Sequence, residues 1–209
     1  MKAFKPWIAG GSLLAALAAL LAGCASPSPA PVLLTLPPAA LAPSAATPPQ
    51  QPASAALLAV RRVAVPEYIV ARRVRYRADA STLAEWPNTY WGERVEIGVS
   101  REFMSALRAQ LPGWPMCDAS CSDQVPALSL QVDLVPMDYL RGSQKLQARA
   151  RITVSSTGMP PKLLQVQETS YEIAATADTA QAQAQAMAAL IGQVAAAAAP
   201  LVRAAQAAP

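Results

Sequence analysis

The sequence contains no histidine. A Ser-His-Asp or Cys-His catalytic arrangement is therefore excluded, and the commonest zinc ligand is missing. Glycine-rich phosphate-binding loops of the dinucleotide and P-loop types are also absent. Carboxylate pairs remain chemically possible, and the only lysines beyond the N-terminal segment, Lys145 and Lys162, lie in no recognisable serine motif. We predict a protein that is not an enzyme and holds no metal or cofactor, with a carboxylate-based enzyme as the least favoured alternative.

The net charge of the chain is also low. The formal charge is +4 at pH 7 and falls to +2 if Lys2 and Lys5 are removed with a signal peptide. Nucleic-acid-binding proteins usually carry a strong basic face, so we expect no nucleic-acid partner. Beyond the N-terminal segment no apolar run approaches the ~20 residues that a membrane-spanning helix needs. The alanine-rich run near the C-terminus is interrupted by Pro200.

The N-terminus has the pattern of a secretory signal. Lys2 and Lys5 give a positive start, and the apolar stretch from Trp7 to Ala22 is too short to cross a hydrocarbon core. It ends in Leu21-Ala22-Gly23-Cys24, which resembles the lipobox of bacterial lipoproteins. In that motif the cysteine thiol accepts a diacylglycerol, and cleavage leaves the cysteine as the new N-terminus.

This resemblance implies that residues 1–23 are a lipoprotein signal peptide. Cys24 would then carry covalent N-acyl and S-diacylglycerol chains, and two or more chains anchor a protein stably. An ordinary signal with a chance cysteine is the alternative. Residue 25 is Ala and not Asp, which by resemblance to enteric sorting rules favours the outer membrane.

Proline dominates the next segment. Residues 25–56 hold nine prolines and no charged residue, a composition that favours extended chain over a packed fold. We predict a tether over residues 24–56 and one folded domain over residues 57–207. Within the tether, Val32–Leu36 is an apolar β-type run bounded by prolines. It is read either as an edge strand, where flanking proline is tolerated, or as an apolar patch in a linker.

Hydrophobic spacing predicts the first half of the domain. Leu57–Val65 is β-branched and apolar apart from Arg61 and Arg62, which favours an interior strand. Val74–Arg77 alternates and predicts a short second strand. A helix is predicted next, with a possible break at Gly98 and its stop at Pro112-Gly113. Its apolar residues recur at helical spacing: Trp91, Val95, Val99, Phe103, Leu107 and Leu111.

Alternation and periodicity predict the second half. Strands over residues 128–134, 146–154 and 163–173 are joined by short turns, which imply an antiparallel meander. A long helix follows, with Asp178 and Gln181 as a capping box and a kink or end at Pro200. The predicted fold is a single α/β domain in which two main helices pack on a mixed, largely antiparallel sheet, in the order β-β-α-β-β-β-α.

This order behind a lipobox resembles the ABC-type transport auxiliary lipoprotein family, the PqiC-like proteins. Residues 63–69, Val-Ala-Val-Pro-Glu-Tyr-Ile, look like the family strand that ends in Pro-Glu-Tyr-Leu. Trp91-Gly92-Glu93 looks like its Trp-Ala-Glu at the start of the first helix. The resemblance covers roughly residues 31–205.

The resemblance implies a function. Family members work with an inner-membrane permease, an ATPase and an MCE-type periplasmic protein that moves lipids between the two membranes. The lipoprotein is the outer-membrane docking piece of this bridge, lipid-anchored and facing the periplasm, and some members form rings, so a homo-oligomer is one expectation. An envelope-assembly or structural lipoprotein without a transporter is the alternative.

Several residues are candidates for contacts. The arginines suggest a surface that docks anions, either lipid headgroups or an acidic partner, because guanidinium binds phosphate and carboxylate bidentately. The alternative is a solvated strand edge. Trp91 and Glu93 are read as a core anchor and a first-turn carboxylate in preference to a partner contact. The candidates for partner or anion contact are Arg61, Arg62, Arg72, Arg73, Arg75 and Arg77, with Glu67 and Tyr68.

Cys117 and Cys121 lie four residues apart. Metal binding would need more ligands, whereas an exported protein sits where disulfides form. We therefore predict a Cys117–Cys121 disulfide, with free thiols as the alternative.

Overall fold

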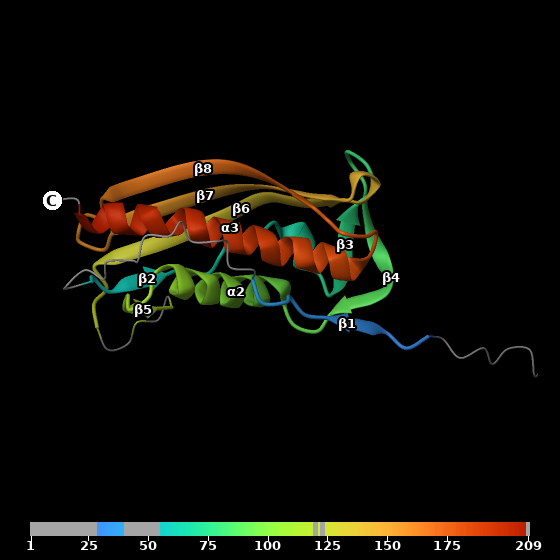
Figure 1. The fold of residues 1–209 in the computed structure, drawn as a ribbon, viewed down its shortest axis with the longest axis horizontal. Coiled ribbons are helices and arrows are strands. Elements are labelled where there is room, and N and C mark those ends of the chain that lie inside the picture. The colour runs from blue at the N-terminus through green and yellow to red at the C-terminus, as the bar shows by residue number, and fades with distance from the viewer. Residues whose placement is uncertain (1–28, 40–54, 119–120, 122–123, 208–209) are drawn as a thin grey trace, which may run out of the picture. The chain divides into compact units, whose positions relative to one another are not determined.

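Three long strands form the antiparallel meander that the alternating pattern predicts. They are β6 (Leu128–Leu140), β7 (Lys145–Ser156) and β8 (Leu163–Ala174), which run side by side in Figure 1. Every second residue of β7 from Leu146 to Val154 is buried, while Arg149 and Arg151 between them are exposed. The computed structural model describes residues 29–39, 55–118, 121 and 124–207.

The remaining strands extend the meander into one eight-stranded mixed sheet. β3 (Arg73–Arg77) and β4 (Leu83–Trp91) form an antiparallel pair, and β3 meets the end of β6 in parallel. β2 (Leu58–Val60) lies parallel to the start of β6, with β5 (Met116–Cys117) on its other side. With its two helices, this sheet makes a single α/β domain, as predicted.

The apolar run in the proline-rich segment joins the sheet. Val32–Leu34 form β1, which pairs in parallel with the end of β4 in the register Val32↔Thr89, Leu33↔Tyr90 and Leu34↔Trp91. Leu34 and Leu36 are buried in the core. Of the two alternatives the structure therefore has the edge strand, and the chain is tied to the domain well before residue 57.

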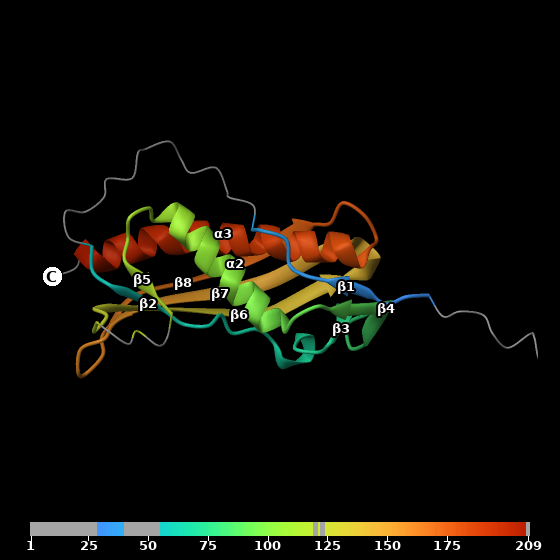
Figure 2. The same ribbon diagram turned by 90° about the horizontal axis from the view of Figure 1, so that it is seen from below.

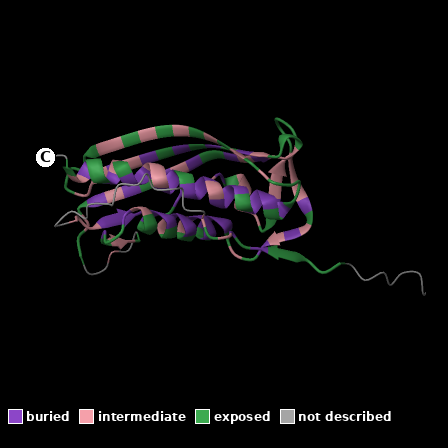
Figure 3. Ribbon diagram, in the orientation of Figure 1, coloured by how far each residue is buried: buried purple, intermediate pink, exposed green. Residues whose placement is uncertain are grey.

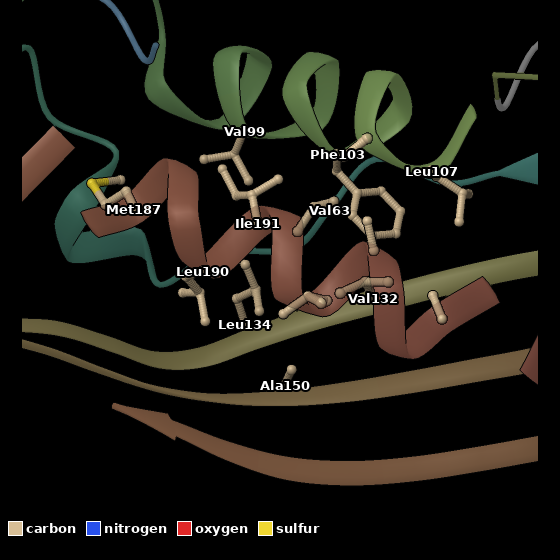
Figure 4. Packing of buried hydrophobic residues seen from close by; sticks show 14 of the residues in the cluster. Val63, Val99, Phe103, Leu107, Val132, Leu134, Ala150, Met187, Leu190 and Ile191 are labelled. Atoms are coloured by element: carbon tan, nitrogen blue, oxygen red, sulfur yellow. The ribbon is translucent and has the colours of Figure 1, made fainter. Parts of the chain in front are cut away.

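Two helices supply the rest of the core. α3 (Ala180–Ala207) packs on β6, β7 and β8, and α2 (Val95–Gln110) packs on α3, so α3 lies between the sheet and α2 (Figures 1 and 2). Figure 4 shows Val99, Phe103 and Leu107 of α2 directed toward α3, with Ile191 facing Val99 and Leu134 of β6 on the far side of α3. The predicted apolar stripe of α3 is confirmed.

The composition of α3 follows from this central position. Alanine and glycine dominate its buried surface, and small side chains let a helix approach a sheet and a second helix closely. α3 is also long and apolar enough by composition to cross a membrane, but 61% of its most apolar window is buried inside the domain. It is therefore a core helix, as the alternation of buried and exposed colours in Figure 3 also shows.

Two strands were missed, β4 and the two-residue β5, and β4 shortens the first predicted helix. Trp91 continues the helical spacing of Val95 and Val99, but it is the last residue of β4, and α2 begins only at Val95. Trp91 is 5% exposed and packs in the same core as the buried residues of α2. Because it is buried like them, it fits their helical spacing by chance, although it belongs to the preceding strand. The helix passes Gly98 without a break. A Cβ there would lie 3.1 Å from Glu93 Oε1 and 3.4 Å from Leu36 Cδ1, so glycine leaves room for both.

The predicted strand Leu57–Val65 is also too long. β2 ends at Val60, and the exposed Arg61 and Arg62 interrupt the ladder before an isolated bridge pairs Ala64 with Asp133. The backbone nevertheless keeps to β6, because Arg61 N donates to Leu130 O at 2.9 Å and Ala64 N donates to Val132 O at 2.9 Å.

The predicted cap of the last helix needs correction, and the helix does not end at Pro200. Thr179 Oγ1 accepts the hydrogen bond of Ala182 N at 3.1 Å and caps the helix in place of the predicted Asp178–Gln181 box. Asp178 is used elsewhere, in an ion pair with Arg141. At the other end the helix continues through the exposed Pro200 to Ala207.

Candidate docking surfaces

An open groove of ≈ 640 Å³ lies beside α2. It lies between the outward face of α2 and the segment that follows β2. We call it the α2 groove and define it by Val60, Arg61, Arg62, Ile97, Met104 and Arg108, together with Ser100, Arg101 and Asp118. Ile97 is 42% exposed. The groove thus combines an apolar floor with four guanidinium groups from two segments.

Most of this positive charge is not neutralised within the domain. Arg101 forms ion pairs with Glu93 at 2.6 Å and Glu102 at 3.0 Å, and both carboxylates raise its pKa. Arg61 Nε donates to Ser129 Oγ at 3.2 Å. Among the described residues Arg61, Arg62 and Arg108 form no ion pair. The groove is therefore suited to an anionic partner with some apolar surface.

Hydrogen bonds through the Ser100 hydroxyl hold the two walls of the groove together. Val63 N donates to Ser100 Oγ at 3.1 Å, and Ser100 Oγ donates to Glu96 O at 2.7 Å. At the far end, Arg203 of α3 donates to Gln110 O at 2.7 Å and satisfies one of the carbonyls that a helix end leaves open. The arginine segment after β2 is thereby fixed alongside α2.

A second, smaller hollow of ≈ 350 Å³ lies where β1 meets the start of α2. We call it the β1 hollow; its lining includes Leu33, Arg72, Trp91, Gly92, Arg94 and Glu96. Arg72 is exposed and forms no ion pair among the described residues. Arg94 forms an ion pair with Glu96, a carboxylate whose side chain is only 8% exposed.

The other candidate arginines make contacts inside the domain. Arg73 and Arg75 both reach Glu85 on the neighbouring strand, at 3.4 Å each. Arg77 reaches Asp138 Oδ1 at 2.9 Å, with the two side chains only 19% and 16% exposed. The six arginines are thus distributed over three places: the α2 groove, the β1 hollow and the β3 face.

The Pro-Glu-Tyr element forms a single turn, η2 (Glu67–Ile69), beside Arg77. Tyr68 is half-buried and its ring lies 5.5 Å from the Arg77 guanidinium. Burial, and next the Asp138 carboxylate, raise the pKa of the Tyr68 phenol. Glu67 is exposed in this turn. Tyr68 thus belongs to the contact between β3 and β6.

Trp91 is a core residue, as expected, but Glu93 is not the first-turn carboxylate: it lies before the N-cap Arg94, and Glu96 is the acidic residue of the first turn of α2. Trp91 is buried at the β4 end, and Glu93 precedes α2 and accepts from Arg101. Both residues also line the β1 hollow, so each can be reached by a ligand in that hollow.

Sequence reasoning missed the most connected arginine, Arg141 in the turn η3 (Arg141–Ser143). It pairs with Asp178 through several contacts of 2.9 to 3.2 Å and donates to Tyr76 Oη at 2.9 Å. Its guanidinium also lies 4.4 Å from the Trp86 ring centroid. Arg141 therefore ties β3, β4 and the start of α3 together, and no local pattern marks it.

The cysteines divide between described and undescribed residues. Cys117 Sγ and Cys121 Sγ are bonded to each other, with Cα atoms 5.5 Å apart. Cys24 and the signal segment lie outside the described residues. Among the described residues no group of three or more Cys, Asp or Glu side chains is placed to hold a metal ion.

Comparison with known proteins gives one family, and solved structures with a similar fold. The family model for the ABC-type transport auxiliary lipoprotein component matches residues 35–199. A crystal structure of an uncharacterized protein superposes with a TM-score of 0.63 at 19% identity, covering 82% of this chain and 98% of that one. The crystal structure of a DUF330 protein from Xanthomonas campestris gives 0.62 at 13% identity, covering 85% and 95%. No protein of curated function matches.

Proposed function

Since the chain belongs to the family of ABC-type transport auxiliary lipoprotein components, we propose that it is the lipid-anchored subunit that docks an intermembrane lipid transporter at the outer membrane. The family is a transport component and not a class of enzyme. In this proposal the partner is an MCE-type periplasmic protein, which is linked to an inner-membrane permease and its ATPase.

The observation that carries the proposal is the charge of the α2 groove. Arg61, Arg62 and Arg108 line the open groove and form no ion pair among the described residues, and Asp118 is the one carboxylate among the lining residues. Charged side chains that a domain leaves uncompensated beside exposed apolar surface are typical of interaction sites, where they steer association and fix register. The groove accordingly favours an acidic, partly apolar segment of a partner protein.

The anchor is the second part of the proposal. Cleavage before Cys24 and acylation of its thiol and amine would tie the domain to the membrane, and Ala25 favours the outer membrane. In that location the Cys117–Cys121 disulfide would form in an oxidising compartment. The domain would then face the periplasm and meet the transporter there, as a single copy or in a ring.

An envelope-assembly or structural lipoprotein without a transporter is the competing function. One experiment separates the two: the full-length lipidated chain, tagged at its C-terminus, is purified from detergent-solubilised envelope after mild cross-linking. Recovery of an MCE-type protein with its permease and ATPase, lost at high salt, supports the proposal. Recovery of envelope-assembly proteins in their place contradicts it. Intact mass of the same sample shows whether Cys24 is acylated, and Cys24→Ser is the unprocessed control.

A further inference from the structure

The distance between anchor and domain is short. The chain enters the sheet at Val32, only eight residues after Cys24, and eight residues of fully extended chain span at most about 26–29 Å. Because β1 is part of the sheet, only residues 25–31 separate Cys24 from the first residue that pairs with the domain. If Cys24 carries lipid, as the proposed function holds, the β1 end of the domain lies close to the bilayer.

The surface at this end has the composition of a membrane contact. Val32 is 41% exposed and Leu33 is 61% exposed, although Leu34 next to them is buried. β1 pairs with β4, and its other edge has no strand partner among the described residues. An exposed apolar edge strand is normally covered or charged to prevent aggregation. Leu34, the next residue, is buried in the core, and β1 carries no charged residue. Val32 and Leu33 therefore need another surface to cover them.

Beside Leu33 lies the β1 hollow with its arginines. Arg72 has no ion pair among the described residues, and Arg94, 68% exposed, is held only by Glu96. Guanidinium recognises phosphate through paired hydrogen bonds. The hollow of ≈ 350 Å³ is at the lower end of the range of ligand sites, ~300–1,000 Å³. Trp91 supplies part of its lining.

We propose that the β1 hollow binds phospholipid headgroups of the bilayer that carries the anchor, with Arg72 on the phosphate and Leu33 in the interface. This rests on the proposed lipid anchor and adds the orientation of the domain. α2 starts at the hollow and runs away from it, so the α2 groove leads from the membrane surface toward the periplasm. From Ile97 to Arg108 it extends about 17 Å at ~1.5 Å per residue.

The test uses the full-length lipidated protein in phospholipid vesicles that contain a headgroup nitroxide. A single environment-sensitive fluorophore is attached at Leu33→Cys, or at Val166→Cys as the matched control. Val166 is also an exposed apolar strand residue, 49% exposed, but on β8. The chain without an added cysteine controls for labelling elsewhere. We expect several-fold stronger quenching at position 33 than at position 166; equal quenching, or stronger quenching at 166, overturns the proposal.

A second variant tests the phosphate contact. Arg72→Gln should reduce quenching at position 33 to the level seen at 166, whereas Arg149→Gln on β7, also an exposed arginine, should leave it unchanged. Unchanged quenching in Arg72→Gln, with the melting temperature of the wild type, overturns the assignment to Arg72. Quenching that disappears when inorganic phosphate is added would show a site for a soluble anion, and would also overturn the proposal.

Flotation of the vesicles separates the two levels of inference. Protein that floats with the lipid but is not quenched at position 33 refutes the headgroup site and leaves the anchor intact. Protein that neither floats nor carries acyl mass refutes the anchor, and the headgroup site fails with it because its position depends on the tether.

Discussion

Ser100 Oγ accepts the hydrogen bond of Val63 N at 3.1 Å and donates to Glu96 O at 2.7 Å. Val63 is 2% exposed, so its amide cannot turn to water when this bond is lost. This one side chain connects the segment that carries Arg61 and Arg62 to the middle of α2. The shape of the α2 groove therefore depends on a hydroxyl in its wall.

Ser100→Ala should destabilise the domain by about 1–2 kcal/mol, because it leaves a buried amide without its partner. Chemical denaturation measures this loss. Ser105→Ala, an exposed position on the same helix, is the control and should change stability by less than about 0.5 kcal/mol. Equal stability of the two variants would show that the Val63 amide finds another acceptor.

Gln183 is a second buried connection. It is 5% exposed, accepts from Trp86 Nε1 at 2.7 Å and donates to Arg75 O at 2.7 Å, and so joins α3 to β3 and β4. Gln183→Leu keeps the side-chain volume but removes both hydrogen bonds, which leaves Trp86 Nε1 and Arg75 O without this partner. We expect the free energy of unfolding to fall by about 2–3 kcal/mol. Gln185→Leu, exposed on the same helix, should be near neutral in the same denaturation experiment. A smaller loss of stability in Gln183→Leu than in Gln185→Leu would contradict the bridging role of Gln183.

Periodic patterns carried most of the fold prediction. β6 and β7 show clean alternation because each has one side against the core, and α3 shows helical spacing between the sheet and α2. The type of these three elements was predicted correctly, but the end of β6 and the cap of α3 were not. β4 shows neither. It contains Pro87, which cannot donate to a ladder, and Asn88 with a φ of 48°, which usually mark a turn. They are tolerated because both lie outside the registers of the neighbouring strands: β1 pairs with β4 only over Thr89–Trp91, and the β3–β4 ladder shifts register between Glu85 and Tyr90.

Site residues were predictable only one segment at a time. The arginine pair Arg61-Arg62 is visible in the sequence, but its neighbours Arg101 and Arg108 come from α2, some forty residues later. No spacing rule brings these segments together; the contact depends on how α2 packs on α3. Arg141 was missed for the same reason, since its partners Tyr76, Trp86 and Asp178 come from three other elements.

The buried tyrosines predict a loss of stability in alkali. Burial, and next the charge of Asp178, raise the pKa of Tyr139 above its ordinary value of 10.0. Above about pH 10 the unfolded phenol ionises first, so the free energy of unfolding should fall as pH rises toward the folded-state pKa. Below that window both states are protonated and Tyr139 contributes no pH dependence.

Tyr139→Phe separates this effect from other titrations. The Tyr139 hydroxyl is buried and has no hydrogen-bond partner among the described residues, so the variant should be as stable as the wild type, or more so, near neutral pH. It should also lose less stability between about pH 8 and pH 11, measured by denaturation at each pH. A variant that is less stable at neutral pH would show that the hydroxyl is satisfied.

The Cys117–Cys121 bond should protect both thiols. Alkylation of freshly purified, denatured protein without reductant is expected to label neither cysteine, and mass spectrometry detects any label. The bond closes a loop of a few residues, for which chain entropy gives about 2 kcal/mol. The variant with both Cys117→Ser and Cys121→Ser should be less stable by that order. Two labelled thiols in wild-type protein would return the pair to the free-thiol reading.

The last prediction concerns the α2 groove. Arg62 and Arg108 are exposed and form no ion pair among the described residues, so reversing their charge should cost little stability. If the groove binds an acidic partner, Arg62→Glu with Arg108→Glu should weaken binding to the co-purified MCE-type protein at least about tenfold, equal to about 1.4 kcal/mol.

The matched control for this double variant is Arg149→Glu with Arg151→Glu, two exposed arginines on β7 that carry the same change in charge. Both variants have the same net charge, so a general electrostatic effect would weaken both equally. Surface plasmon resonance at low salt should show slower association for the groove variant alone. Near 1 M salt, where the Debye length is ~3 Å, the affinity of the wild type should fall by as much as the affinity of the groove variant falls at low salt. Equal binding by the two folded variants would exclude the α2 groove as the docking site.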